Sequence, residues 1–303
     1  MENLIKSTNL TAVREVDFVS RFTRDIGILR DLLGSIRLEK LAAGTQLTAK
    51  SAAVTLNTTA VGEGEAIPYN KIEYSTTPIG ILEFDKQAVG VSLEAIAKHG
   101  YNSAIQAADD DMIYRLEARL MNKFTSFLLT GTLTKSINET DFQMALAEAL
   151  GQVQSKWEDM DKGYSGIIGF CNTLDAYRYL GASNITVQND FGMTYLSNFL
   201  GFSRLFLSSR VPFSKIIATP AENIVMSYID ATDNDFTKAG FNFRTDGDLN
   251  LIAVYVNGNH HNMVSDLITV TGISLAAEYI DGISVVDFSG NTAEKPAKGT
   301  DSE

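Results

Sequence analysis

The sequence predicts an α+β protein organised around one long helix, and three features of the chain lead to this prediction. A helical period runs from Asn102 to Gly131, the segment 47–93 is rich in residues that favour extended chain, and the segment 141–248 alternates short helices with apolar strands. A folded core is expected, because 45% of the 303 residues are hydrophobic and only 20% are charged.

The long helix is predicted from the spacing of its apolar residues, which recur at steps of three and four. They are Ile105, Ala108, Met112, Leu116, Leu120, Phe124, Phe127 and Leu128. Asn102 is the expected N-cap, since its short side chain can accept hydrogen bonds from the first turn. Gly131 is the expected stop, because glycine readily takes a left-handed conformation. At 1.5 Å per residue the helix is roughly 40 Å long, enough to span a domain.

The N-terminal segment 1–46 is expected to form a partly extended arm. Asp17 to Leu41 carries a helix-like pattern, but Gly27 and Gly34 interrupt it, and two glycines cost about 2 kcal/mol in a helix interior. An ordinary N-terminal helix is the alternative. Residues 1–50 contain eight Lys and Arg against six Asp and Glu, a net +2, which leaves −14 on the rest of a chain whose total is −12.

Segment 47–93 is predicted to contain a long β-hairpin. Leu47–Leu56 is rich in Thr, Ala and Val, the tip VGEGEAIPYNK has the composition of a loop, and extended-chain residues resume at Ile72. Few large apolar residues lie in the first arm, and a lone two-stranded ribbon is marginally stable in water. We therefore expect the hairpin to rest on something else. Ser92–His99 is predicted to be a short helix that leads into the long one.

The region 141–248 is predicted to be a compact α/β domain. Asp141 begins a helix, Gly166–Phe170 is a buried strand, and Asn172 or Thr173 caps the next helix. A further short helix is expected at Tyr195–Gly201. Strands are then expected at 205–207, 216–217 and 224–229. Beyond this region, 249–257 is expected to be a strand or the end of a helix–strand unit, and strands are expected at 267–270 and 284–288. The last stretch, 290–303, has the composition of a disordered tail.

Composition excludes several classes of protein. The single cysteine, Cys171, rules out an intrachain disulfide, and a reducing compartment is the simplest interpretation. No apolar run approaches the roughly 18 residues of a membrane span, and the N-terminus lacks the form of a signal peptide. The net charge of −12 disfavours tight DNA binding by phosphate neutralisation.

The sequence predicts no catalytic residue, no cofactor site and no metal site. Adjacent His260 and His261 point to opposite sides of an extended chain, and His99 is the only other histidine. Asp109–Asp111 diverge around a helix, so a solvated face is expected instead of a carboxylate pair. Cys171 is expected to be a small core residue.

Two further stretches resemble nucleotide-binding motifs but depart from them. The stretch GTLTKS at 131–136 resembles a phosphate-binding loop but lacks its glycine before the lysine. Gly62-Glu-Gly64 lacks the third glycine of a dinucleotide fingerprint and does not follow a strand–turn–helix context.

Five strings of the sequence resemble, in the same order, the major capsid protein of tailed double-stranded DNA phages, whose fold is named after phage Hong Kong 97. They are VGEGEAIP followed by VSLEAIAKHG (61–68 and 91–100), AIQAADDDMIYRLEARLMNKFTSFLLTGT (104–132), SGIIGFCNTLDAYRYLG (165–181), FLGFSRLFLSSRVPFSKIIATPAENI (199–224) and ISLAAEYIDGISVVDF (273–288). The resemblance covers roughly residues 10–289.

The resemblance implies a Hong Kong 97-type capsid fold with an extended loop, a spine helix and two domains. The implied parts are an N-terminal arm (1–46), an extended hairpin loop (47–93), a peripheral domain with the spine helix (94–140), an axial domain (141–248), a return to the peripheral domain (249–289) and a disordered tail (290–303). Some relatives carry an N-terminal scaffolding domain. This chain starts at the arm, so we expect a separate scaffolding protein.

The implied function is a structural coat protein and not an enzyme. The resemblance implies self-assembly into hexamers and pentamers of an icosahedral head shell, made in the host cytoplasm and located in the virion capsid. It implies a scaffolding protein, a portal protein and weakly contacted double-stranded DNA as partners, and no membrane. An encapsulin-type cellular compartment is an alternative within this class. A soluble α/β enzyme, with 141–257 as catalytic domain, is the alternative from another class.

Some relatives crosslink their subunits through a lysine of the hairpin and an asparagine of a neighbour. Such a reaction needs a dry pocket in which the lysine can lose its proton. Lys50, Lys71 and Lys86 lie in this segment, but no motif distinguishes them, and Glu65 and Glu73 near Lys71 favour its charged form. We therefore expect a shell without covalent crosslinks.

Overall fold

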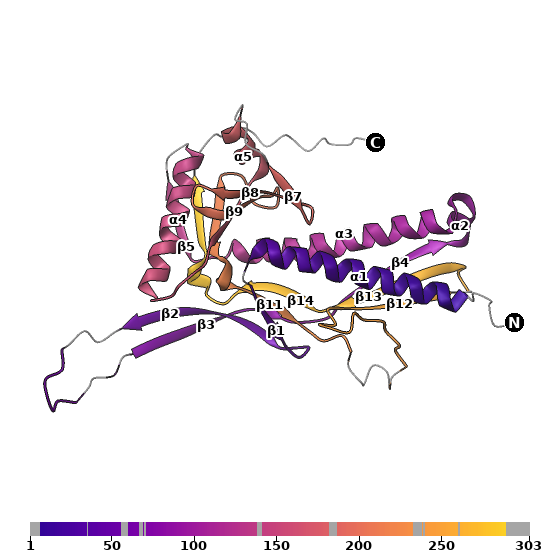
Figure 1. Cartoon of the computed structure of the whole chain (residues 1–303), viewed down its shortest axis with the longest axis horizontal. Helices are drawn as coiled ribbons and strands as arrows, with labels where there is room; N and C mark the ends of the chain where they lie inside the picture. The colour runs from indigo at the N-terminus through magenta and orange to yellow at the C-terminus, as the bar shows by residue number, and fades with distance from the viewer. Residues whose placement is uncertain are drawn as a thin grey trace, which may run out of the picture. The chain divides into compact units, whose positions relative to one another are not determined.

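A computed structural model of the chain describes residues 7–34, 36–55, 60–66, 69, 71–137, 141–181, 187–232, 238, 240–259 and 261–288, without the side chains of 7–12, 52–55, 71 and 72. The chain forms two compact units (Figure 1). The first comprises Met1–Leu128 and Ala221–Tyr279, and the second Leu129–Pro220 and Ile280–Glu303. The sequence predicted domain boundaries at 140/141 and 248/249. The two units instead change at 128/129, 220/221 and 279/280.

The first unit contains three helices and three small sheets among its described residues. Its helices are α1 (Ser7–Leu33), α2 (Leu93–His99), α3 (Tyr101–Leu128) and the 3-10 turn η1 (Ala221–Asn223). Its strands are β1 (Arg37–Lys40), β2 (Gln46–Thr55), β3 (Lys71–Ile81), β4 (Asp85–Ser92), β11 (Ile224–Tyr228), β12 (Ile252–Asn259), β13 (Val264–Thr271) and β14 (Ile273–Ala277). The sheet orders are β1-β11-β14, β12-β13-β4 and β2-β3.

The second unit is built on one seven-stranded sheet of order β5-β15-β10-β6-β9-β8-β7. Its strands are β5 (Leu133–Ile137), β6 (Ile167–Cys171), β7 (Gln188–Asp190), β8 (Met193–Phe199), β9 (Phe202–Leu207), β10 (Lys215–Pro220) and β15 (Ser284–Phe288). Its helices are α4 (Phe142–Asp159), α5 (Thr173–Leu180) and the 3-10 turn η2 (Ile280–Gly282). Helix α4 packs on β10 and β15, with Leu146 and Val153 fully buried.

The capping predictions of the second unit are confirmed. The Asp141 side chain accepts a hydrogen bond from the Gln143 N–H at 2.9 Å and begins α4. The Asn172 side chain accepts one from the Leu174 N–H, also at 2.9 Å, and begins α5. Both side chains satisfy amide groups that have no partner within the helix.

Ser7–Leu33 form one long helix, so the prediction of a partly extended arm is wrong for these residues, whereas Arg37–Lys40 are extended as strand β1. Gly27 lies inside α1, and Gly34, at φ +90°, follows its end as the left-handed stop. The helix packs on β12, and its buried face contains Phe22 and Leu29. Burying several such side chains at about 1.5–3 kcal/mol each outweighs the roughly 1 kcal/mol cost of one interior glycine.

Both predicted ends of the long helix are also corrected. Helix α3 begins at Tyr101, directly after Gly100, so Asn102 lies within its first turn. It ends at Leu128, three residues before Gly131. A Cβ built on Gly131 would lie 2.6 Å from a methyl carbon of Ile283. Close packing against Ile283, and not a left-handed turn, therefore requires this glycine.

Two segments of the second unit form strands that the sequence did not predict. The expected helix at Tyr195–Gly201 is wrong, because β8 pairs antiparallel with β9 through a turn at Leu200 and Gly201, both with positive φ. The stretch GTLTKS contributes to β5, which pairs parallel with β15. Neither local pattern outweighs the hydrogen bonds that these segments gain in the sheet, where β8 lies between β9 and β7 and β5 is an edge strand.

Within the described part of the chain, no helix combines the length and hydropathy that a membrane crossing requires.

Candidate assembly surfaces

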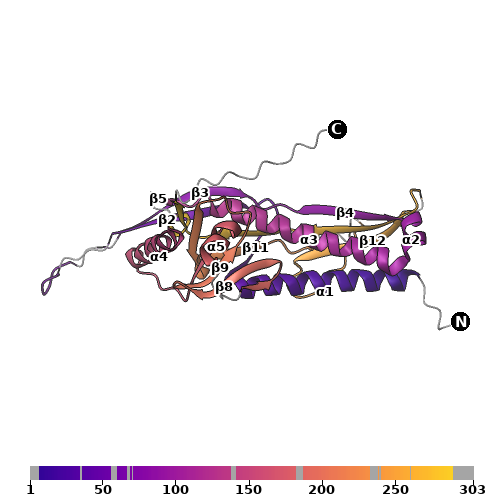
Figure 2. The ribbon, with the colours of Figure 1, turned by 90° about the horizontal axis from the view of Figure 1, so that it is seen from above.

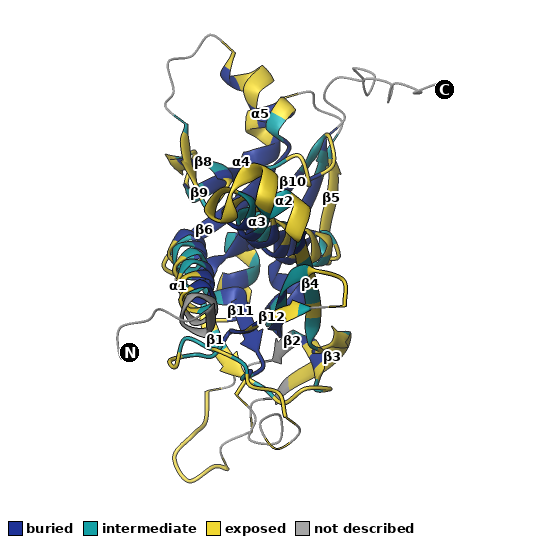
Figure 3. Cartoon of the chain, turned by 90° about the vertical axis from the view of Figure 1, so that its right-hand side faces the viewer, coloured by how far each residue is buried: buried dark blue, intermediate teal, exposed yellow. Residues whose placement is uncertain are grey.

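The first candidate surface is the ribbon, defined here as the antiparallel pair β2 and β3 with the segment between them. The two strands form a sheet of their own, which confirms the predicted hairpin. Residues 73–78 are all exposed, as are the described tip residues 60–66 and Tyr69 (Figure 3). Tyr69 is 98% and Tyr74 55% exposed. A two-stranded ribbon with so little burial has its side chains available to a partner.

The base of the ribbon, by contrast, is anchored in the first unit. Leu47 of β2 packs with Leu82 and Ile229 in a small apolar cluster. Ala49 is fully buried, and the register shift between Leu47 and Thr48 leaves Ile79 of β3 as the extra residue opposite them. Among the described residues, the apolar contacts that hold the ribbon lie at its base.

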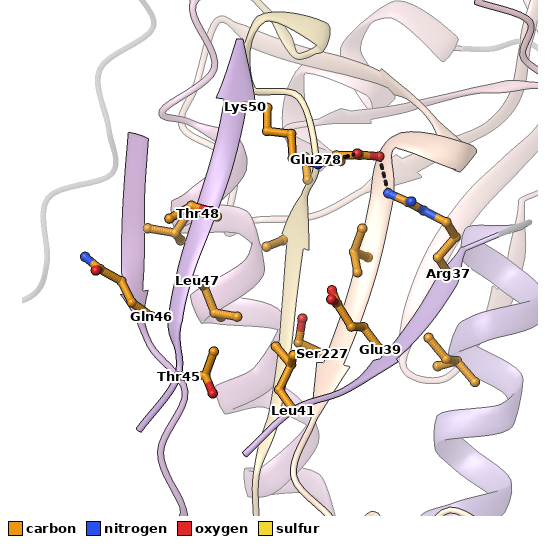
Figure 4. A pocket seen from close by; sticks show the side chains of 15 residues that line it. Arg37, Glu39, Leu41, Thr45, Gln46, Leu47, Thr48, Lys50, Ser227 and Glu278 are labelled. Atoms are coloured by element: carbon orange, nitrogen blue, oxygen red, sulfur yellow. Dashed lines mark hydrogen bonds and ion pairs between the residues drawn. The ribbon is translucent and has the colours of Figure 1, made fainter. Parts of the chain in front are cut away.

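A cleft of about 420 Å³ lies beside this base (Figure 4). Its lining comes from β1, the start of β2, β11 and the end of β14. The carboxylate of Glu278 binds two cations there: Lys50 Nζ at 3.1 Å and the Arg37 guanidinium. The hydrogen bond and charge of Glu278 raise the pKa of Lys50. We call these three residues the clamp.

The second candidate surface is the charged seam between α1 and α3, two roughly parallel helices of the first unit (Figure 2). The Arg14 guanidinium donates to both carboxylate oxygens of Asp109, at 2.8 and 2.5 Å, and both side chains are buried. Arg21 forms an ion pair with Asp110. Asp109 is therefore a buried partner, and the prediction of a solvated face is wrong for it.

The seam also contains a pair of like charges. Burial, followed by the charge and hydrogen bond of Asp25, raises the pKa of Glu117 to about 7. Asp25 belongs to α1 and Glu117 to α3, and Arg24 pairs with Asp25 at 3.1 Å. Two carboxyl groups within hydrogen-bonding reach are compatible only when they share a proton.

The third candidate surface is a basic stripe on α3. Arg115, Arg119 and Lys123 are spaced four residues apart and so share one helix face. Their side chains are 75%, 51% and 61% exposed. Asp111 pairs with Arg115 at 2.7 Å, and Asp85 pairs with both Arg119 at 2.8 Å and Lys123 at 3.7 Å. The stripe retains a net positive charge on an otherwise acidic protein.

Other motifs singled out in the sequence do not form a reactive site in the described residues. Cys171 is fully buried, with its thiol 3.7 Å from the Phe206 carbonyl oxygen, which confirms its role as a small core residue. His99 and His261 are exposed, and His260 lies outside the described residues. No group of three or more potential metal ligands occurs in the described part of the chain.

Sequence reasoning missed the clamp and the seam, because both join residues far apart in the chain. A signal for the seam was present: Arg14 and Arg21 are seven residues apart and therefore share a face of a helix. Because this segment was predicted to be partly extended, Arg14 and Arg21 were not expected to share a helix face. For the clamp no local signal exists, since Glu278 is more than 200 residues from both cations.

The architecture is the Hong Kong 97-type capsid fold, as the sequence strings predicted. The capsid protein of cyanophage P-SCSP1u aligns with a TM-score of 0.55 at 10% identity, covering 84% of this chain and 87% of that one. The capsid of an empty GTA particle aligns at 0.52 and 12% identity, covering 86% and 89%.

An encapsulin also aligns over most of its length. The encapsulin SrpI of Synechococcus elongatus gives a TM-score of 0.51 at 13% identity, covering 85% of this chain and 86% of that one. No family model matches the sequence, and no curated protein sequence is significantly similar to it. At these identities the likeness establishes the fold, which shell-forming proteins of both kinds share.

Proposed function

We propose that this chain is the major capsid protein of a tailed phage and self-assembles into the icosahedral head shell that encloses double-stranded DNA. The observation that carries the proposal is the ribbon. It is anchored at its base, exposed at the described residues 60–66, 69 and 73–78, and its two strands form a separate two-stranded sheet. A closed shell places neighbouring copies where such a ribbon can bury its surface.

Charge complementarity supports a specific contact between copies. The ribbon carries Glu63, Glu65 and Glu73 at exposed positions, whereas the basic stripe on α3 is exposed and positive. In a single copy the ribbon points away from its anchored base. The ribbon of one copy lying on the basic stripe of the next would therefore match acidic with basic residues and fix the register of neighbours.

The parts of the chain are assigned as follows under this proposal. The first unit supplies the peripheral domain with its spine helix α3 and the hairpin loop, and the second unit supplies the axial domain at the centre of hexamers and pentamers. A scaffolding protein and a portal protein direct assembly in the host cytoplasm. A net charge of −12 keeps contact with packaged DNA weak, so that DNA moves freely during filling.

A cellular encapsulin-type compartment is the second candidate, because the encapsulin SrpI shares the fold over most of both chains. The absence of catalysis is proposed for both candidates, since the structural neighbours are shell proteins.

Expression of the chain, alone and with its neighbouring genes, tests the proposal by electron microscopy and size-exclusion chromatography. Closed shells that need a scaffold or protect DNA from nuclease support the phage capsid. Closed shells that enclose a protein encoded nearby support the encapsulin. A small, stable species that never forms capsomers or shells would contradict both.

The ribbon contact is tested by charge reversal. Glu63→Lys with Glu65→Lys should reduce shell yield at least tenfold, and Arg115→Glu with Arg119→Glu should restore it when the changes are combined. Glu158→Lys, an exposed change on α4, is the matched control. Unchanged yield in the first variant would exclude this contact while leaving the capsid function open.

A further inference from the structure

Glu278 is fixed to the core of the first unit by its backbone. Its N–H donates to the Asn223 carbonyl at 2.8 Å. The neighbouring Tyr279 exchanges two hydrogen bonds with the Asn223 side chain, at 2.8 and 2.9 Å. Asn223 is fully buried, so the segment that carries Glu278 is a rigid reference point.

From this point Glu278 holds the ribbon twice. Its carbonyl oxygen accepts a hydrogen bond from the Lys50 N–H at 2.6 Å, and its carboxylate accepts one from Lys50 Nζ at 3.1 Å. Lys50 also forms a parallel bridge with Tyr279. Along β3, which faces β2 across the ribbon, residues 73–78 are exposed. The hydrogen bonds between Lys50 and Glu278 therefore lie at the boundary between the anchored base of the ribbon and its exposed part.

The same carboxylate separates two cations. Arg37 of β1 pairs with Glu278 from the side opposite to Lys50 (Figure 4). The positive charge of Arg37 repels that of Lys50 and acts to lower the pKa of Lys50, but Glu278 raises this pKa by more. Removal of the carboxylate would therefore leave two like charges facing each other, which pushes β1 and β2 apart.

A small change at the base becomes a large change at the tip. The part of β2 from Lys50 to Thr55 extends about 17 Å at roughly 3.3 Å per residue. A tilt of roughly 10° at Lys50 moves the end of that strand by about 3 Å, which is enough to break a hydrogen-bonded contact with a neighbour. The open cleft beside the base gives β2 room to tilt.

We propose that Glu278 is the positioning residue that sets the direction in which the ribbon leaves the first unit. Its consequence for contacts between copies rests on the proposed function, because the direction of the ribbon decides which part of a neighbour it meets. The role itself belongs to the single chain and is measurable without a shell.

The test measures ribbon direction by distances between two spin labels. The labels are placed at Ser75→Cys on β3 and Asn257→Cys on β12, both exposed positions. Cys171 is fully buried and burial raises the pKa of its thiol, so it does not compete for label. Labelled chains are diluted in excess unlabelled protein, so that only distances within a chain contribute, whether or not shells form.

The variants distinguish loss of the clamp from general destabilisation of the fold. Glu278→Gln and Lys50→Met should each broaden the distance distribution about twofold. Arg37→Met should leave it unchanged, because the bond between Lys50 and Glu278 remains. Glu94→Gln, an exposed change on α2, is the control. Circular dichroism confirms that each variant is folded, and Lys50→Met keeps the test valid if Glu278→Gln does not fold.

A charge swap provides the rescue. In the Arg37→Met background, Lys50→Glu combined with Glu278→Lys should restore a narrow distribution. A parental width in both Glu278→Gln and Lys50→Met would overturn the proposal, as would a charge-swapped variant no narrower than Glu278→Gln. Failure to form shells would count against the proposed function alone, because these distances do not depend on it.

Discussion

Replacing Glu117 by glutamine removes the acidic contact between α1 and α3 without changing the shape of the side chain. Glutamine stays neutral at every pH and can still donate a hydrogen bond to Asp25. The charged group that acts on Glu117 is Asp25 of α1, which is paired with Arg24; the ion pairs Arg14–Asp109 and Arg21–Asp110 of the seam do not involve Glu117. The stability of the variant should therefore lose its dependence on the protonation of Glu117, while the ion pairs of the seam remain.

The sign and size of this response follow from the pKa of Glu117, which is raised from 4.5 to about 7. Between these pH values the folded protein holds a proton that the unfolded chain has released, so stability falls as pH rises from 4.5 to 7. Full conversion at 1.36 kcal/mol per pH unit gives roughly 3 kcal/mol. Glu117 is only half-buried, and solvent screening reduces this to about 1–2 kcal/mol.

Hydrogen exchange of α1, corrected for the intrinsic pH dependence of amide exchange, measures this effect locally. Protection of the described part of α1 around Asp25 should fall about tenfold between pH 5 and pH 8 in the parent, since 1.4 kcal/mol corresponds to a factor of ten. It should stay constant in Glu117→Gln and fall as in the parent in Glu158→Gln. Equal pH dependence in the parent and Glu117→Gln would refute the reasoning.

Three further predictions concern packing, the C-terminus and covalent chemistry. Gly131→Ala places a methyl group against Ile283 and should destabilise the second unit by about 1–3 kcal/mol. Gly151→Ala, where an added Cβ meets no atom within 4 Å, should stabilise α4 by about 0.5–1 kcal/mol. Thermal unfolding measures both, and a Gly131→Ala variant more stable than Gly151→Ala would contradict the prediction. Truncation after Ser289, in a segment outside the described residues, should leave shell formation intact, and loss of shells by a folded truncated chain would contradict this. Mature particles boiled in detergent should run on a gel as one band near the 33.0 kDa monomer, and a ladder of heavier bands would point first to Lys71, whose side chain is not described.

Hydrogen exchange also tests the expected behaviour of the ribbon, which should be weakly protected in free subunits and strongly protected in shells. Its thin apolar content predicts this, because few side chains can stabilise it without a neighbour. Equally strong protection in both states would show that the ribbon is stable on its own.

The sequence determined those elements whose stability is local. The period of α3 is visible because one face of the helix is buried along its whole length, from Ile105 to Leu128. The caps at Asp141 and Asn172 are visible because each acts on amides two residues away. The ribbon is visible because a loop-forming tip separates two extended segments.

The tertiary structure decided what depends on distant partners. Helix α1 is continuous across Gly27 because β12 covers its apolar face, and no residue near Gly27 encodes that cover. The segment at β8 is a strand because β9 lies beside it and supplies hydrogen bonds. The Arg14–Asp109 pair and the clamp at Glu278 join charges that only the folded chain brings together. Local patterns record which conformation a segment prefers, whereas ion pairs and sheet edges depend on which other segment arrives beside it.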